Sequence, residues 1–150
     1  MALLATIMAL AAPSLGRSLR GRNLDQEAKR FIAATEWARN EAVSQGVPMT
    51  VWIDVEGGAF GVESKPGYPV AKQIQKRYEL NPDVHFEMGD NTGGTAGAEG
   101  TLNAAELSPD GTPDASSIAS LRLVDRFNAA VSIVKTRDGW GYEIVKGEQQ

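Results

Sequence analysis

The chain has 150 residues, of which 42% are hydrophobic and 23% charged, a composition typical of one globular domain and not of a disordered chain. It has no cysteine, which excludes disulfides, zinc–thiolate sites and thiol nucleophiles. Of the formal net charge of −4, residues 1–50 carry six basic against four acidic side chains, and residues 51–150 carry nine against fifteen. An acidic body argues against a nucleic-acid platform, which normally needs a basic face.

An uncharged apolar run, ALLATIMALAAPSL, opens the chain at residues 2–15. It is short of the roughly 20 apolar residues that a membrane-spanning helix needs. Two further interpretations stay open. The run can be a signal peptide cleaved near Ala9-Leu10-Ala11, although no basic residue precedes it. Alternatively, Met1 is not the natural start, and the apolar segment begins upstream.

A helical pattern follows three arginines at positions 17, 20 and 22. Asp25 and Glu27 are expected near its polar start, and Gly46 and Pro48 are expected to end it. A helix from about residue 3 to 45 would be roughly 60 Å long, so its first half should project from a body of this size. Side chains at steps of three and four form the predicted sheet-facing stripe, with Ile32 and Trp37 beside it: Leu24, Ala28, Phe31, Thr35, Ala38 and Ala42.

From Pro48 onward the hydrophobic period changes from helical to alternating, which predicts strands. The glycine-rich residues 89–101 are expected to form an exposed loop. The predicted fold class is α+β, with one long helix covering a single antiparallel sheet of meandering hairpins. The predicted strands are residues 49–55, 59–63, 74–80, 84–88, 104–107, 118–124, 130–136 and 140–145, with turns at residues 56–58, 108–112 and 137–139.

The sequence gives only weak signals for catalysis or metal binding. His85 is the only histidine, and no partner for acid–base or nucleophilic catalysis is indicated. Oxygen ligands at Asp90, Asn91 and Glu99 could hold calcium, but a solvated loop is the simpler interpretation. No catalytic residue, metal site or cofactor is therefore assigned.

Two of the tryptophans have different expected roles. Trp37 is expected to lie in the core, whereas Trp52, on the polar face of its strand, could mark a contact with a partner. Glu36 and Glu41 are expected to be solvated or paired with nearby basic side chains.

Three stretches of the sequence resemble the GspH/FimT family of pseudopilins. The first is residues 2–15, which look like the second half of the pilin hydrophobic helix with its proline, Pro13. The second and most specific is residues 38–46, ARNEAVSQG, followed by the strand at 49–53. The third is residues 107–112, LSPDGT, with the strand at 118–124. The family's processing site, a glycine, an aromatic, a short apolar stretch and a glutamate, would lie upstream of Met1. The resemblance therefore implies a chain truncated at its N-terminus, without the segment that this family methylates.

The resemblance implies a minor pseudopilin of a type II secretion pseudopilus, acting by helix packing and subunit contacts and not as an enzyme. It implies a single-pass protein of the bacterial inner membrane, with residues 1–22 as the packing segment and residues 23–150 as a periplasmic domain. The expected partners are other minor and major pseudopilins and the membrane, with no nucleic acid and no small-molecule substrate. The residues expected to serve membrane insertion and assembly are Leu3, Leu4, Ile7, Leu10 and Pro13, and those expected to dock the helix on the sheet are Leu24, Phe31, Ile32 and Trp37.

Two alternatives stay open. One is a FimT-like type IV minor pilin acting in pilus assembly or DNA uptake, although Lys135, Arg137 and Lys146 are spread among acids. The other, of a different class, is an exported β-domain that binds a ligand after signal cleavage. The arginines at 17, 20 and 22 conflict with a periplasmic body under the positive-inside rule, and the resemblance is given precedence.

Overall fold

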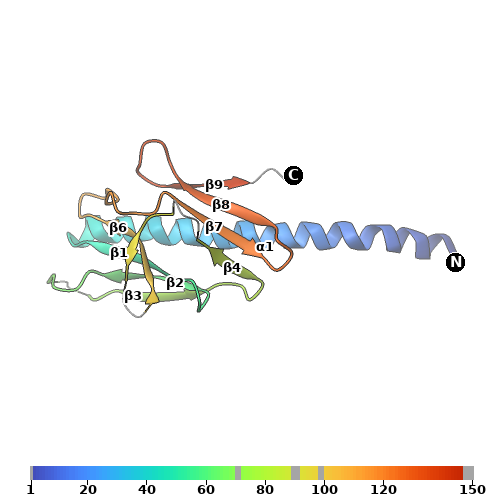
Figure 1. The fold of residues 1–150 in the computed structure, drawn as a ribbon, viewed down its shortest axis with the longest axis horizontal. Helices are drawn as coiled ribbons and strands as arrows, with labels where there is room; N and C mark the ends of the chain where they lie inside the picture. The colour runs from blue at the N-terminus through green and yellow to red at the C-terminus, as the bar shows by residue number, and fades with distance from the viewer. Residues whose placement is uncertain (1, 70–71, 89–91, 98–99, 147–150) are drawn as a thin grey trace.

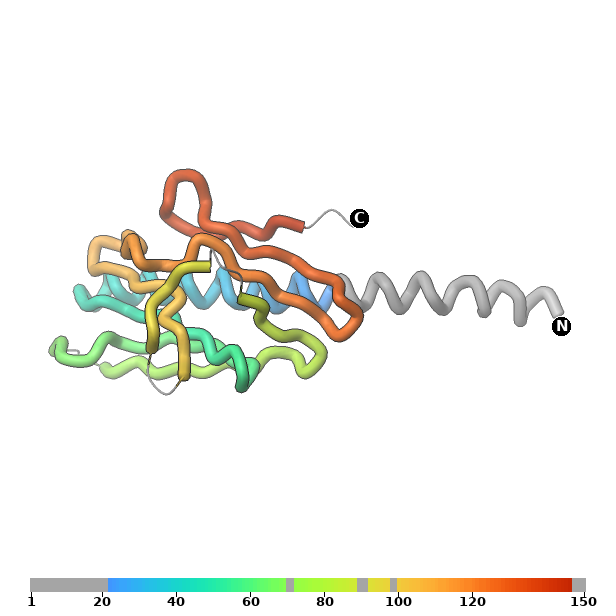
Figure 2. The backbone as a smooth tube through the Cα atoms, viewed as in Figure 1, coloured from blue at the N-terminus to red at the C-terminus, as the bar shows by residue number. Residues whose placement is uncertain are grey.

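The structure, a computed structural model, describes the backbone of residues 2–69, 72–88, 92–97 and 100–146, and within these ranges the side chains from Arg22 onward. One helix and two antiparallel sheets make up the fold, and the sheets lie along the second half of the helix (Figure 1). The predicted α+β class is confirmed. The tube in Figure 2 shows strands on both sides of this half of the helix, and the helix contacts strands of both sheets.

The helix, α1 (Ala2–Gln45), is one continuous element of 44 residues, about 66 Å long at 1.5 Å per residue. It ends as the sequence predicts. Gly46 adopts a φ of 67°, which costs a glycine little, and its N–H donates to the carbonyl oxygen of Ala42 at 2.9 Å. The stripe of residues at positions 24, 28, 31, 35, 38 and 42 forms the buried face of the helix.

The expectation of a single sheet of meandering hairpins is wrong. The strands divide into two sheets, and each sheet contains a pairing between strands that are not consecutive, β1 with β6 and β4 with β7. Alternation predicts which face of a strand is buried, but it does not select the neighbouring strand. The first sheet has the order β3-β2-β1-β6-β5, with β1 (Met49–Asp54), β2 (Ala59–Ser64), β3 (Gln75–Glu79), β5 (Thr95–Ala96) and β6 (Leu102–Leu107). The second has the order β4-β7-β8-β9, with β4 (Val84–Glu87), β7 (Ser120–Asp125), β8 (Ala130–Lys135) and β9 (Tyr142–Lys146).

Asp side chains cap the predicted turns. Asp54 Oδ1 accepts a hydrogen bond of 2.8 Å from the N–H of Gly57, at the turn between β1 and β2. Asp110 accepts from the N–H of Thr112 at 2.9 Å between β6 and β7. Such Asx turns satisfy backbone donors locally and so fix where each strand ends. The short strand β5 forms within residues 89–101, which were expected to be loop throughout.

Aromatic rings hold the core together between the helix and both sheets. Phe31 of α1 packs edge to face against Phe60 of β2, and Phe60 in turn packs against Phe86 of β4, with centroids 6.4 Å apart. Phe31 also contacts Tyr142 of β9, with centroids 6.4 Å apart. Each such buried ring contributes on the order of 2–3 kcal/mol by leaving water. The two sheets therefore share one core, with α1 at its centre.

Candidate assembly surface

The residues predicted to serve membrane insertion and assembly lie on the N-terminal part of α1. The side chains of Leu3, Leu4, Ile7, Leu10 and Pro13 are outside the described residues, and only their backbone is placed, within the helix. Where the structure does describe the chain, it contains no helix with both the length and the apolar character of a membrane span.

The four residues predicted to dock the helix lie on its sheet-covered half. Leu24 and Phe31 are buried in the core, and Ile32 and Trp37 are partly buried and pack against it. The ammonium group of Lys76, on β3, lies 4.0 Å from the centroid of the Trp37 ring. A cation over an indole face stabilises by about 0.5–1 kcal/mol at an exposed site, so β3 helps to hold this tryptophan.

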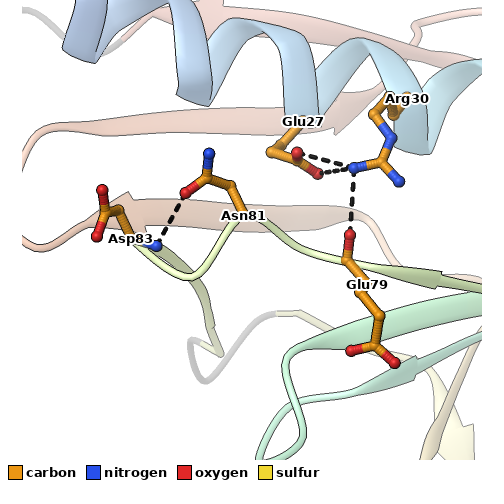
Figure 3. A network of polar contacts seen from close by, with 5 residues as sticks. All are labelled: Glu27, Arg30, Glu79, Asn81 and Asp83. Carbon is orange, nitrogen blue, oxygen red and sulfur yellow. Dashed lines mark hydrogen bonds and ion pairs between the residues drawn. The ribbon is translucent and has the colours of Figure 1, made fainter.

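A polar network ties α1 to the connection between β3 and β4 (Figure 3). Both carboxylate oxygens of Glu27 accept from Arg30 Nη1 at 2.8 Å, and the same nitrogen donates to the carbonyl oxygen of Glu79 at 3.2 Å. Within the same connection, Asn81 Oδ1 accepts a hydrogen bond of 3.0 Å from the N–H of Asp83, which stabilises the turn there. Glu27 was expected near the polar start of the striped pattern, but its side chain is buried. The helix continues through this position, and Glu27 is buried with a charged partner.

An open groove of about 500 Å³ runs along the face of α1 that the sheets leave uncovered. Lys29 Nζ lies 2.8 Å from Asp25 Oδ2 on this face, and that bond holds the pKa of the Asp25 carboxyl below its usual value. The charges are mixed and solvated, which suits contact with another polypeptide better than proton-transfer chemistry. The groove is lined by Arg22, Asp25, Gln26, Lys29, Arg30 and Ala33.

Trp52, the residue considered for a partner contact, is half-buried by its own chain. It lies opposite Gly61 on the paired strand β2, and a Cβ at position 61 would lie 2.2 Å from Trp52 Cζ2. The guanidinium of Arg77 is 5.6 Å from the ring centroid on the next strand. The indole thus covers a glycine within the sheet, and Gly61 is a residue that sequence reasoning missed.

Two of the stretches that carry the family resemblance meet in space. Residues 38–45 form the last turns of α1, and Gly111 from the 107–112 turn lies over them, with φ at 88°. A Cβ at Gly111 would stand 3.2 Å from Val43 Cγ2 and 3.4 Å from Arg39 Cγ. The turn between β8 and β9 approaches the same place, because a Cβ at Gly141 would lie 3.5 Å from Arg39 Nη2. These three segments form one end of the folded body, and the role of Arg39 there was not predicted.

The residues considered for catalysis or metal binding do not lie close together among the described residues. His85 is exposed on β4, and Asp90, Asn91 and Glu99 are outside the described residues. Glu36 is exposed, and Glu41 accepts a hydrogen bond of 2.8 Å from Gln45 Nε2. Among the side chains that the structure describes, no three His, Asp or Glu residues gather closely enough to hold a metal ion.

The sequence model of the family described as "Type II transport protein GspH" matches residues 27–140, which include the end of the helix and every strand except β9. The chain belongs to the GspH family. The resemblance drawn from residues 38–46 and 107–112 is thereby confirmed, because both stretches lie inside the matched region. GspH-family proteins are structural pilin-like subunits.

Solved structures agree on the fold. Two structures of the minor pseudopilin EpsH from the type II secretion system of Vibrio cholerae are similar to this GspH-family chain. They are 13% and 14% identical, with TM-scores of 0.59 and 0.61, and the matches cover 85% and 86% of this chain and 99% and 98% of theirs. The type IV minor pilin FimU of Pseudomonas aeruginosa is 12% identical, with a TM-score of 0.56 over 85% of this chain and 90% of its own. No curated protein matches the sequence significantly.

Proposed function

We propose that this GspH-family chain is a minor pseudopilin subunit of a type II secretion pseudopilus, and that it acts by helix packing and subunit contacts without making or breaking bonds. The observation that carries the proposal is the family match over residues 27–140, together with the fold that the chain shares with EpsH. The open face of α1 supports an assembly role, because a long helix with one covered and one uncovered face is suited to pack against a neighbour.

The proposal includes a division of labour along the chain. Residues 1–22 would lie in the inner membrane and pack against other subunits, and residues 23–150 would form the periplasmic domain. The uncharged run at residues 2–15 and the continuity of α1 support this division. So does the position of Leu24, the first buried apolar residue of the described core. The proposed partners are other minor and major pseudopilins.

The similarity to FimU favours a second candidate, a minor pilin of a type IV pilus. A DNA-binding version of this candidate has less support, because basic side chains are paired with acids on the described surface, as Arg122 is with Glu87 and Arg77 with Glu79. Pairs of this kind leave few free cations for phosphates. A cleaved, ligand-binding β-domain stays the alternative of another class.

Deletion of the gene in its source bacterium, followed by complementation, tests the proposal. Loss of extracellular enzymes from the culture medium, restored by the intact gene, is the expected result. Normal secretion with lost surface motility or lost DNA uptake would instead establish the type IV pilus role. N-terminal sequencing of the protein from the cell distinguishes the third candidate, since cleavage near Ala11 would remove the packing helix.

A further inference from the structure

The Arg39 side chain lies beneath two loops at the end of α1. Gly111, between β6 and β7, covers the aliphatic part, since a Cβ there would lie 3.4 Å from Cγ and 3.6 Å from Cδ. Gly141, between β8 and β9, covers the guanidinium at Nη2. At Gly111, whose φ is 88°, the approach is tight and favours glycine, since a Cβ there would lie 3.2 Å from Val43 Cγ2. Figure 1 shows the end of α1 and these connections at the same end of the molecule.

Two donors of this guanidinium are buried and lack an acceptor. Within the described part of the chain, Arg39 Nε and Nη2 make no hydrogen bond. These nitrogens lie along one edge of the guanidinium plane and donate in parallel, at the spacing of the two oxygens of a carboxylate. A buried donor left without a partner is a defect that folded proteins seldom keep. The site is therefore one bidentate acceptor short of completion.

The carboxylate of Asp138, which is close enough for the Arg39 charge to act on it, is held by other donors. Its Oδ1 accepts from Thr136 Oγ1 at 2.5 Å and from the N–H of Trp140 at 3.0 Å. The Thr136 hydroxyl, then the Trp140 N–H and, more weakly, the Arg39 charge lower the pKa of Asp138. Asp138 thus stays ionised and fixes the β8–β9 turn, and the edge of Arg39 remains open to another acid.

Two exposed apolar side chains belong to the segments that meet at Arg39. Val43, one turn further along α1, is 55% exposed, and Trp140, next to Gly141, is 48% exposed. Large exposed apolar side chains beside an arginine have the composition of an interaction hot spot, in which tryptophan and arginine are enriched. This combination favours a protein partner over a polyanion, because a nucleic acid or a lipid headgroup offers phosphates without apolar side chains.

We propose that this end of the folded body docks a different pilin-like subunit. The surface, called here the Arg39 end, is formed by Arg39, Val43, Gly111, Trp140 and Gly141. That subunit places an Asp or Glu carboxylate on Nε and Nη2 of Arg39, with a neighbouring apolar side chain against Val43 and Trp140. The nature of the partner rests on the proposed function. A symmetric pair of two copies is disfavoured, because it would bring two Arg39 guanidinium groups together.

Docking needs only a small displacement of the loops. Nη2 is covered by the backbone at Gly141, which has no side chain to move, and the adjacent Trp140 already faces solvent. A shift of the β8–β9 turn as one body, with the hydrogen bonds of Asp138 kept, would open Nη2 to a carboxylate. The pair that forms is charge-assisted and bidentate, which makes it stronger than a hydrogen bond between neutral groups.

Site-specific photo-cross-linking of the full chain in its source bacterium tests the proposal. One photoreactive residue replaces Val43 at the Arg39 end, and another replaces Gln26, which is exposed in the groove on α1. We expect the residue at 43 to cross-link to another pilin-like subunit, at a peptide that contains Asp or Glu. Arg39→Gln, and also Arg39→Lys, which keeps the charge but loses the two-nitrogen edge, should lower the yield about tenfold or more.

Three further variants separate docking from folding. Arg122→Gln removes an exposed arginine of β7 and should leave the cross-link at position 43 unchanged. If Arg39→Gln impairs folding, as judged by protease resistance, Trp140→Ser replaces an exposed side chain and should lower the yield in a folded protein. Arg39→Glu combined with an Arg at the partner's cross-linked acid should restore the yield.

The results distinguish this proposal from the proposed function. Cross-links from Gln26 to pilin-like subunits, with none from Val43, would overturn the docking at the Arg39 end and leave the subunit role intact. A Val43 cross-link to a second copy, to a peptide without an acid, or one indifferent to Arg39 would also overturn it. If neither position reaches a pilin-like subunit, the proposed function itself fails.

Discussion

Phe31 of α1 and Phe60 of β2 meet edge to face, with ring centroids 5.5 Å apart and ring planes inclined at 66°. On its other side Phe31 contacts Tyr142 of the second sheet, so this one side chain joins the helix to both sheets. These contacts hold the helix and the two sheets together as one body.

Replacing Phe31 with Ala should lower the free energy of unfolding by about 3–5 kcal/mol, since it removes a buried ring and leaves a cavity between helix and sheets. Chemical denaturation of the purified chain in detergent, followed by tryptophan fluorescence, measures the change. Glu36→Ala, at an exposed position of the same helix, is the control and should stay within about 0.5 kcal/mol of the parent. Equal losses in the two variants would contradict the role given to Phe31.

Gly61→Ala should destabilise the first sheet by about 1–3 kcal/mol. The new Cβ would lie 2.2 Å from Trp52 Cζ2 and 2.3 Å from the carbonyl oxygen of Lys76, and the carbonyl belongs to the backbone and cannot rotate away. Gly57→Ala is a matched control. There the clash at 2.2 Å is with the carboxylate of Asp54, a side chain that can turn aside at the cost of one hydrogen bond, about 1 kcal/mol. Thermal unfolding that ranks Gly57→Ala as the more damaging change would refute this account.

The local features of the fold could be predicted from the sequence. The end of the helix at Gly46, the strand after Pro48 and the turn at residues 108–112 each depend on neighbouring residues, and the sequence displays them directly. The pairing of β1 with β6 depends on contacts between distant segments, and no local pattern carries it. This is why one sheet was expected where the chain forms two.

The candidate surfaces also depend on contacts between distant segments, which the sequence does not display. Helical spacing alone brings Arg30 within reach of Glu27, three residues away. Only the folded chain adds the Glu79 carbonyl as a second acceptor for Arg30 and buries Glu27. Arg39 belongs to the most specific stretch of the sequence, residues 38–46, but the loops that cover it, at Gly111 and Gly141, lie more than seventy residues away in the sequence. No periodic pattern in the sequence indicates that a charged residue of the helix will lie opposite such glycines.

Glu27→Gln should lower the free energy of unfolding by about 1–3 kcal/mol, because it removes the charge from a buried carboxylate that accepts two hydrogen bonds from Arg30. Arg77→Gln breaks exposed ion pairs with Glu79 and Asp54, and should change stability by less than about 1 kcal/mol. Urea denaturation of both variants at neutral pH makes the comparison. Equal effects would mean that the Glu27–Arg30 pair is as solvated as the pairs on β3.

Stability should fall between pH 10 and pH 12 because of Tyr142. Burial raises the pKa of this phenol from 10.0 to about 12, an interaction with Ser117 opposes part of the shift, and the hydroxyl donates to the carbonyl oxygen of Ile118 at 3.0 Å. A folded-state pKa above the unfolded value gives stability that is complete below pH 10 and is lost as pH rises to about 12, here about 2–3 kcal/mol. Tyr142→Phe removes this part of the pH dependence. A stability difference between parent and variant that stays constant from pH 9 to 12 would disprove the assignment.

Ile7→Asp should release the chain from the membrane while its domain stays folded. The proposed packing segment, residues 1–22, is apolar at this position, and a carboxylate at the centre of a membrane helix costs about 2.5–3.5 kcal/mol on insertion scales. Leu10→Asp should act in the same way, because it introduces the same charge into the same run. Membrane fractionation with alkaline extraction measures the anchoring, and protease resistance of the released protein reports the fold, whose described core begins at Leu24. Ser44→Asp adds an equal charge at an exposed position near the end of α1 and should leave the chain in the membrane fraction. An Ile7→Asp chain that stays in the membrane and still restores secretion would show that this part of α1 neither inserts nor packs as proposed.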